Sequence, residues 1–140
     1  MNISSKAEYG IRAMVEIAGA RGPLKRTDIA GRQAIPVPFL TQVLRSLVNV
    51  GLVRSSRGPE GGYALARPPG DITLLDIVTL LQGPVMPKGC LDRNKPDVCL
   101  VGGPDCLLRD VWSALKQANE RVLASVTLDD LASVHQGGPR

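Results

Sequence analysis

Aromatic residues, histidine and long apolar runs are scarce in this 140-residue sequence. Only 3% of the residues are aromatic although 44% are hydrophobic, so a core must be built from aliphatic side chains. One histidine, without a nucleophile elbow or a phosphate-binding loop, offers no catalytic constellation, and we expect no enzyme. No run of about 18 apolar residues occurs, so no membrane span is expected. The N-terminus lacks the features of a signal peptide, which predicts a cytoplasmic protein.

Positive charge is concentrated in the first half of the chain. Residues 1–67 carry ten Lys or Arg and four Asp or Glu, a charge of +6, whereas the whole chain carries +4. A basic first half beside an acidic second half favours a polyanionic partner such as nucleic acid. A merely solvated surface is the alternative that charge alone leaves open.

Helical periodicity predicts three helices in the first fifty residues, over 4–20, 24–35 and 36–51. The third helix has a stripe of apolar positions that we expect to be buried, namely Phe39, Leu40, Val43, Leu44, Leu47 and Val48. The exposed positions left over are Thr41, Gln42, Arg45, Ser46 and Asn49. Two short helices in tight succession, the second with exposed polar residues, are typical of a helix-turn-helix.

A β-hairpin is predicted directly after these helices. Two β-prone arms, 52–55 and 62–66, flank the sequence "SRGPEGG", whose glycines permit positive φ and close backbone approach. Arg57 lies at the tip without an apolar neighbour. After a helix-turn-helix, such a wing arginine favours a phosphate or minor-groove contact over a solvated turn.

The second half combines two further helices with an irregular segment. A helix over 71–83 should close the core of a DNA-binding domain at residues 1–82. In residues 83–106, eight of 24 are Gly or Pro, which predicts a loop. Residues 107–126 resume a long amphipathic pattern that needs a partner surface, either its own domain or a second copy of the chain. We favour the second copy, because helix-turn-helix proteins commonly bind DNA as dimers. Residues 127–140 are expected to form a short helical turn and a tail, with the only histidine, His135, solvated.

All three cysteines lie in the loop, as Cys90, Cys99 and Cys106. Their separations of eight and six residues contain no CxxC pair, the pattern of short zinc sites. Long gaps in a flexible loop suit an iron–sulfur cluster, in which each iron takes its own thiolate. A metal-free thiol switch, zinc, or an incidental role are the alternatives.

The segments "SSKAEYGIRAMVEIA", "RSSRGPEGGY" and "ITLLDIVTLLQGP", with the three-cysteine loop before a long helix, resemble the Rrf2 family. These are bacterial winged helix-turn-helix transcription regulators, several of which carry an iron–sulfur cluster. The resemblance covers about residues 1–130. It implies a mainly α fold with a small β-hairpin wing and a long C-terminal dimerisation helix.

The resemblance also implies how DNA would be bound. A homodimer would place the helix beginning near Pro38 in the major groove of a palindromic promoter site, with Thr41 and Gln42 reading bases and Arg57 in the minor groove. The family's regulator of cluster assembly has Glu at the position of Thr41, so this chain should prefer a different sequence. The predicted DNA-contacting set is completed by Arg45, Ser55 and Lys6.

The three thiolates leave one cluster ligand to be found. The cluster-assembly regulator has a His three residues after its third cysteine, but Arg109 stands there and cannot bind iron. Other members use an acidic residue of the first helix across the dimer, and Glu8 matches that position. A small thiol or water is the competing ligand.

The sequence thus predicts a transcription repressor that senses redox state, nitric oxide or iron through a cluster, with [4Fe–4S] preferred over [2Fe–2S]. A metal-free thiol regulator and a protein-binding adaptor are the alternatives. A helix-turn-helix followed by a hairpin with a basic tip favours the DNA regulator.

Overall fold

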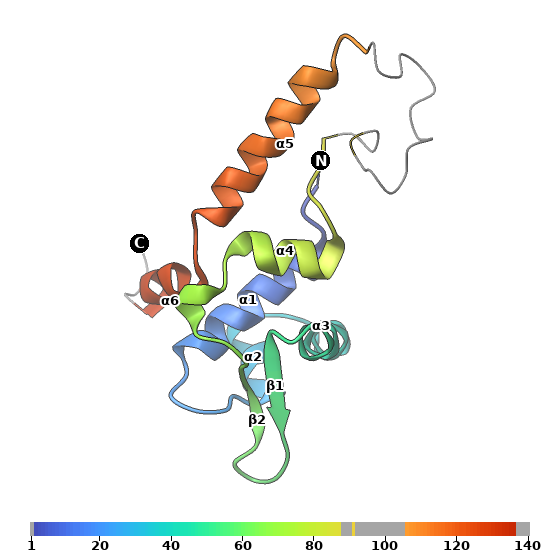
Figure 1. Cartoon of the computed structure of the whole chain (residues 1–140). Coiled ribbons are helices and arrows are strands. Elements are labelled where there is room, and N and C mark those ends of the chain that lie inside the picture. Colours follow the sequence, from blue (N-terminus) through green and yellow to red (C-terminus); the bar gives the residue numbers. More distant parts are fainter. Residues whose placement is uncertain (1, 88–90, 92–105, 137–140) are drawn as a thin grey trace.

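The computed structural model describes residues 2–87, 91 and 106–136 (Figure 1). The elements are α1 (Ser5–Gly19), α2 (Arg26–Gln33), α3 (Val37–Asn49), β1 (Val53–Ser56), β2 (Gly62–Leu65), the 3₁₀ turn η1 (Pro69–Asp71), α4 (Leu74–Gln82), α5 (Arg109–Ala124) and α6 (Leu128–Gln136). The predicted class, mainly α with a β-hairpin wing, is confirmed. Within the described residues, no helix is long and apolar enough to cross a membrane.

Helix α1 is the centre of the core and contacts α2, α3, α4 and α6. Ser4 caps its start, because the Ser4 hydroxyl accepts the backbone N–H of Ala7 at 3.1 Å. Gly10 lets α4 approach closely, since a Cβ at this position would lie 2.4 Å from Leu81 Cδ1. The largest fully buried side chains around α1 are aliphatic, as predicted: Met14, Ile29, Leu40, Leu44, Leu47, Leu52, Ile72, Ile77 and Leu128.

Helices α2 and α3 are joined by a tight turn. Ala34 ends α2 in the left-handed region, with φ of 52° and ψ of 43°, and α3 begins after Pro36. Four predicted stripe positions of α3 are buried, but Phe39 is 59% exposed, so that part of the prediction is wrong. Phe39 lies in the first turn of α3, where its ring meets Tyr9 of α1 instead of the core.

The hairpin pairs β1 with β2 in antiparallel register, and β2 also forms a bridge to Leu24 through Tyr63. The two Leu24–Tyr63 backbone hydrogen bonds are both 2.9 Å long. This close approach requires glycine at position 62, because a Cβ there would lie 2.6 Å from the Leu24 carbonyl oxygen. The wing is thereby fixed to the segment that precedes α2.

The N-termini of α4 and α6 are built alike and lie side by side. Thr73 and Asp76 form a capping box on α4, and Thr127 and Asp130 exchange the same two kinds of hydrogen bond at α6. Thr73 and Thr127 also form an antiparallel bridge. The sequence predicted a short turn and a tail here, whereas residues 128–136 form a helix with Leu128 fully buried.

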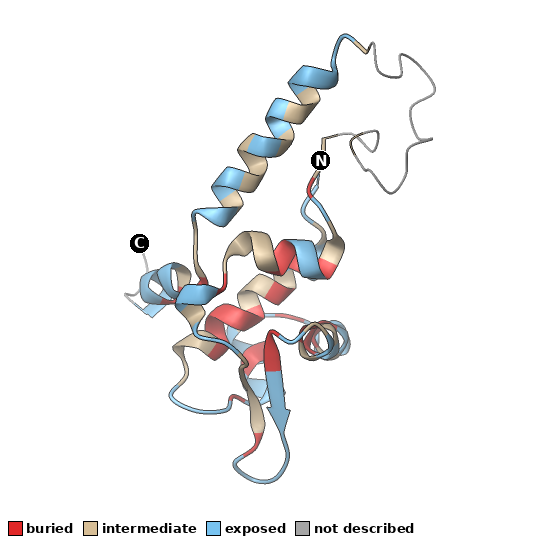
Figure 2. Ribbon diagram, viewed as in Figure 1, coloured by how far each residue is buried: buried red, intermediate tan, exposed pale blue. Residues whose placement is uncertain are grey.

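Helix α5 projects from the rest of the structure, and none of its residues is buried (Figures 1 and 2). It is shorter than the predicted 107–126. Large apolar side chains on it are exposed, among them Val111 at 51%, Leu115 at 41% and Val122 at 65%. Among the described residues, α5 contacts α4 and Leu123 packs against the core, but most of the apolar stripe stays uncovered.

Candidate DNA-binding surface and sensing segment

Helix α3 carries three of the residues predicted to contact DNA. Its buried side, which includes Leu40 and Leu44, fixes it against the core. Gln42 and Arg45 are exposed on the other side, and Thr41 is partly exposed one turn before Arg45. Because residues four apart share a helix face, Thr41 and Arg45 lie along one line of the surface.

The hydroxyl of Thr41 is already engaged inside the protein. It donates to the Val37 carbonyl oxygen at 2.9 Å and accepts a hydrogen bond from Arg26 Nη1 at 3.3 Å. Arg26 is the first residue of α2, so this contact links the two helices at their N-terminal ends. Arg26 was not predicted as a site residue; its only signal in the sequence was membership of the basic segment "LKR".

The wing presents the other predicted contacts. Ser55 lies in β1 opposite Tyr63 and is exposed, and Arg57 is exposed in the loop that follows β1. That loop needs a glycine at position 61, where a Cβ would lie 2.4 Å from the carbonyl oxygen of Ser56. Lys6 is exposed on the first turn of α1, outside both α3 and the wing.

Of the four predicted cluster ligands, the described residues include Cys106 and Glu8. Cys106 is a partly exposed free thiol just before α5, and its carbonyl oxygen accepts the backbone N–H of Arg109 at 3.1 Å. Cys90 and Cys99 lie outside the described residues. Within the described part of the chain, no three His, Cys, Asp or Glu side chains form a group that could hold a metal ion.

Glu8 is 64% exposed in the first turn of α1, and its one ion pair with a described residue is a long one of 3.9 Å to Arg12. A solvated carboxylate with so weak a partner is free to ligate iron. The neighbouring start of the chain is tied to the end of α4, since Gln82 accepts from the Ser4 N–H at 2.7 Å and donates to the Asn2 carbonyl oxygen at 3.0 Å. The predicted loop 83–106, which carries the cysteines and follows α4 directly, therefore begins near the N-terminus of α1.

Arg12 connects Glu8 to both helices of the helix-turn-helix. Its guanidinium lies over the Tyr9 ring, 5.8 Å from the centroid, and the Tyr9 ring lies 6.4 Å from that of Phe39 in α3. Arg12 Nε also donates to Gln33 Oε1 at 3.0 Å, and Nη2 donates to the Gln33 carbonyl oxygen at the end of α2.

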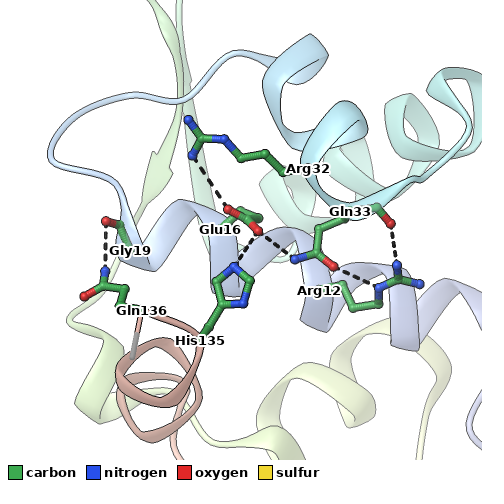
Figure 3. Close-up of polar contacts among 7 residues, drawn as sticks. All are labelled: Arg12, Glu16, Gly19, Arg32, Gln33, His135 and Gln136. Atoms are coloured by element: carbon green, nitrogen blue, oxygen red, sulfur yellow. Dashed lines mark hydrogen bonds and ion pairs between the residues drawn. The ribbon is translucent and has the colours of Figure 1, made fainter. Parts of the chain in front are cut away.

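A buried carboxylate, Glu16, joins α1, α2 and α6 (Figure 3). Its Oε1 accepts from Gln33 Nε2 at 2.7 Å and lies 2.7 Å from His135 Nε2. Its Oε2 lies 3.7 Å from Arg32 Nη1. Glu16 was not predicted as a site residue, and His135 was expected to be solvated, whereas its imidazole holds α6 against α1. One cavity of about 440 Å³ opens beside this cluster.

Comparisons with known proteins agree over nearly the whole chain. The family model for Rrf2, described as an iron-dependent transcriptional regulator, matches residues 3–134. A Mycobacterium tuberculosis protein named as an HTH-type transcriptional regulator is 42% identical over 134 residues, 94% of this chain and 81% of that protein. The structure of CymR, the global cysteine regulator of B. subtilis, superimposes with a TM-score of 0.78 and 36% identity, covering 96% of this chain and 98% of CymR. T. potens IscR gives a TM-score of 0.75 and 34% identity, covering 96% and 88%.

A helix-turn-helix followed by a β-hairpin wing defines the winged-helix class of DNA-binding transcription regulators. The similarity to regulators along the whole chain places this protein in that class, and not among enzymes. The chain belongs to the Rrf2 family, as its wing and cysteine segment had suggested.

Proposed function

We propose that this protein is a homodimeric transcription repressor that binds a palindromic promoter site and responds to the state of an iron–sulfur cluster. The observation that carries the proposal is the uncovered apolar stripe of α5, which begins directly after Cys106. The proposed dimer contact and the proposed sensing thiol are therefore adjacent in the chain.

The stripe on α5 has the spacing of a helix-to-helix seam. Leu108, Val111, Leu115, Ala118 and Val122 follow one another at steps of three and four residues, the pattern of core positions in paired helices. Four of these five are exposed large hydrophobic side chains in the single chain. Burial against the same stripe of a second copy would remove them from water, at about 25 cal/mol per Å² of apolar area.

The dimer would present two copies of α3 and of the wing to two half-sites. Gln42 can pair with adenine through its amide, and Arg45 and Arg57 supply charge for the DNA backbone and the narrow groove. Ser55 and Lys6 are exposed polar residues that would add phosphate contacts.

The donor set suits an iron–sulfur cluster. Three thiolates from Cys90, Cys99 and Cys106 would ligate three irons, and the exposed carboxylate of Glu8 of the partner subunit would take the fourth position of a [4Fe–4S] cluster. Such a cluster supplies a redox- and nitric oxide-sensitive group. A carboxylate holds iron less softly than a thiolate, so the Glu8 corner would be the labile one.

Coupling to DNA would pass through Arg12. If Glu8 ligates iron, its ion pair with Arg12 is weakened, and the guanidinium rests on Gln33 and Tyr9 alone. These two residues support the end of α2 and the start of α3. Cluster loss would thus bias the position of the recognition helix, as a ligand biases a two-state element.

The test is anaerobic purification, followed by absorption spectra, iron and sulfide analysis, and binding to promoter DNA. We expect brown protein, and each Cys→Ala variant should lose colour. Glu8→Gln should release its cluster several-fold faster in air than wild type, whereas Glu60→Gln, an exposed carboxylate of the wing, should not. A Glu8→Gln cluster as stable as that of wild type removes Glu8 from the ligand set.

A metal-free thiol switch is the second candidate. It is favoured by Cys106, a partly exposed free thiol just before α5. Colourless protein whose DNA affinity changes on oxidation and returns with a thiol reductant would establish this mechanism instead.

A further inference from the structure

The Thr41 hydroxyl cannot donate a hydrogen bond to a DNA base in the observed arrangement. A hydroxyl has one proton, and that of Thr41 goes to the Val37 carbonyl oxygen at 2.9 Å. One of its acceptor sites is used by Arg26 Nη1 at 3.3 Å. What position 41 offers to DNA is therefore its methyl group, together with the guanidinium that it holds.

Arg26 has most of its donors free. A guanidinium has five N–H groups, and one of them is directed at Thr41. Arg26 is exposed, and no carboxylate within the described residues lies at salt-bridge distance from it. The unused donors of Arg26 therefore face solvent beside the reading helix.

We propose that Arg26 reads a guanine in each half-site and that Thr41 is its positioning residue. This inference rests on the proposed function, in which α3 lies in the major groove. The two adjacent acceptors of guanine, O6 and N7, match the fork of an arginine, and this is the commonest specific base contact. An arginine at the start of the first helix of a helix-turn-helix would otherwise reach a phosphate. The hydrogen bond to Thr41 draws it instead toward a base-reading position of α3.

A base contact and a phosphate contact predict different patterns of binding affinity across a panel of DNA sites. The experiment measures the affinity of the intact protein for its operator and for every single-base substitution in one half-site, at one salt concentration. In wild type, replacing the guanine should weaken binding by roughly 5- to 150-fold. In Arg26→Ala this penalty should vanish at that base pair and persist at the others.

Two further variants complete the design. Thr41→Val keeps the shape and the methyl group but lacks the hydroxyl, so it should lose discrimination at the same base pair, and the double variant should be no worse than Arg26→Ala. Lys25→Ala removes an equal charge from the neighbouring N-cap position, whose side chain makes no capping hydrogen bond. It should weaken binding uniformly across the panel.

The outcomes separate this inference from the proposed function. If Arg26→Ala weakens every site equally, or changes none, Arg26 is not a base-reading residue and the inference is wrong. If Thr41→Val leaves the panel unchanged, the positioning role is wrong. If Gln42→Ala also binds like wild type at every site, α3 is not the reading helix and the proposed function itself fails.

Discussion

Replacing Glu16 by Ala should destabilise the protein although the residue lies outside the predicted DNA and cluster sites. The Glu16 side chain is 6% exposed, and its carboxylate accepts from Gln33 Nε2 and contacts His135 Nε2, both at 2.7 Å. A hydrogen bond to a charged group contributes about 1.5–3 kcal/mol. The substitution also recovers the cost of burying the carboxylate, and the half-exposed His135 can be hydrated. We therefore expect a net loss of about 2 kcal/mol in the free energy of unfolding.

Urea unfolding at a fixed protomer concentration measures this loss, because the stability of the proposed dimer would depend on concentration. With an m-value of about 2 kcal/mol per molar, the midpoint should fall by about 1 M urea. Arg32→Ala is the matched control: its guanidinium is 3.7 Å from Glu16 and 56% exposed, so it should cost less than about 1 kcal/mol. A change below about 0.5 kcal/mol for Glu16→Ala, with an unaltered m-value, would refute the structural role of this cluster.

Three further predictions concern separate parts of the molecule. Hydrogen bonds from the backbone and side chain of Thr127 lower the pKa of Asp130 below 3.8. The contribution of Asp130 to stability is therefore present above that pH and lost as pH falls through the lowered pKa. In urea titrations, the difference in stability between wild type and Asp130→Asn should close in acid. Gly61→Ala should destabilise the wing by about 1–3 kcal/mol and weaken DNA binding in a mobility-shift assay, because its Cβ would lie 2.4 Å from a carbonyl oxygen of β1. Gly22→Ala is the control: this position has open space around it, so the variant should bind DNA normally. Leu115→Glu should convert the proposed dimer to monomers in sedimentation velocity, whereas Gln117→Glu on the same helix should not.

The parts of the fold that sequence could predict are those with a local signal. The capping serine of α1, the capping box at Thr73 and Gly61 of the wing each act on residues close by in the chain. The sequence "TLDD" at the start of α6 is a capping box of the same kind as "TLLD" at α4, so α6 could have been found from it. The exposure of Phe39 could not be predicted in this way, because periodicity shows which face of a helix is buried but not how far the core extends along that face.

The residues of the candidate site also fall into two groups, those with a local signal in the sequence and those without one. Thr41, Gln42 and Arg45 were predicted as exposed from the periodicity of their helix, and Arg57 from its place at the tip of the hairpin. The contact of Arg26 with Thr41 spans 15 residues, and that of Glu16 with His135 spans 119, so neither has a local pattern. Both depend on how helices pack, and both change the meaning of a residue that the sequence had interpreted alone: a hydroxyl expected to face DNA holds an arginine, and a histidine expected in solvent fixes the last helix to the first.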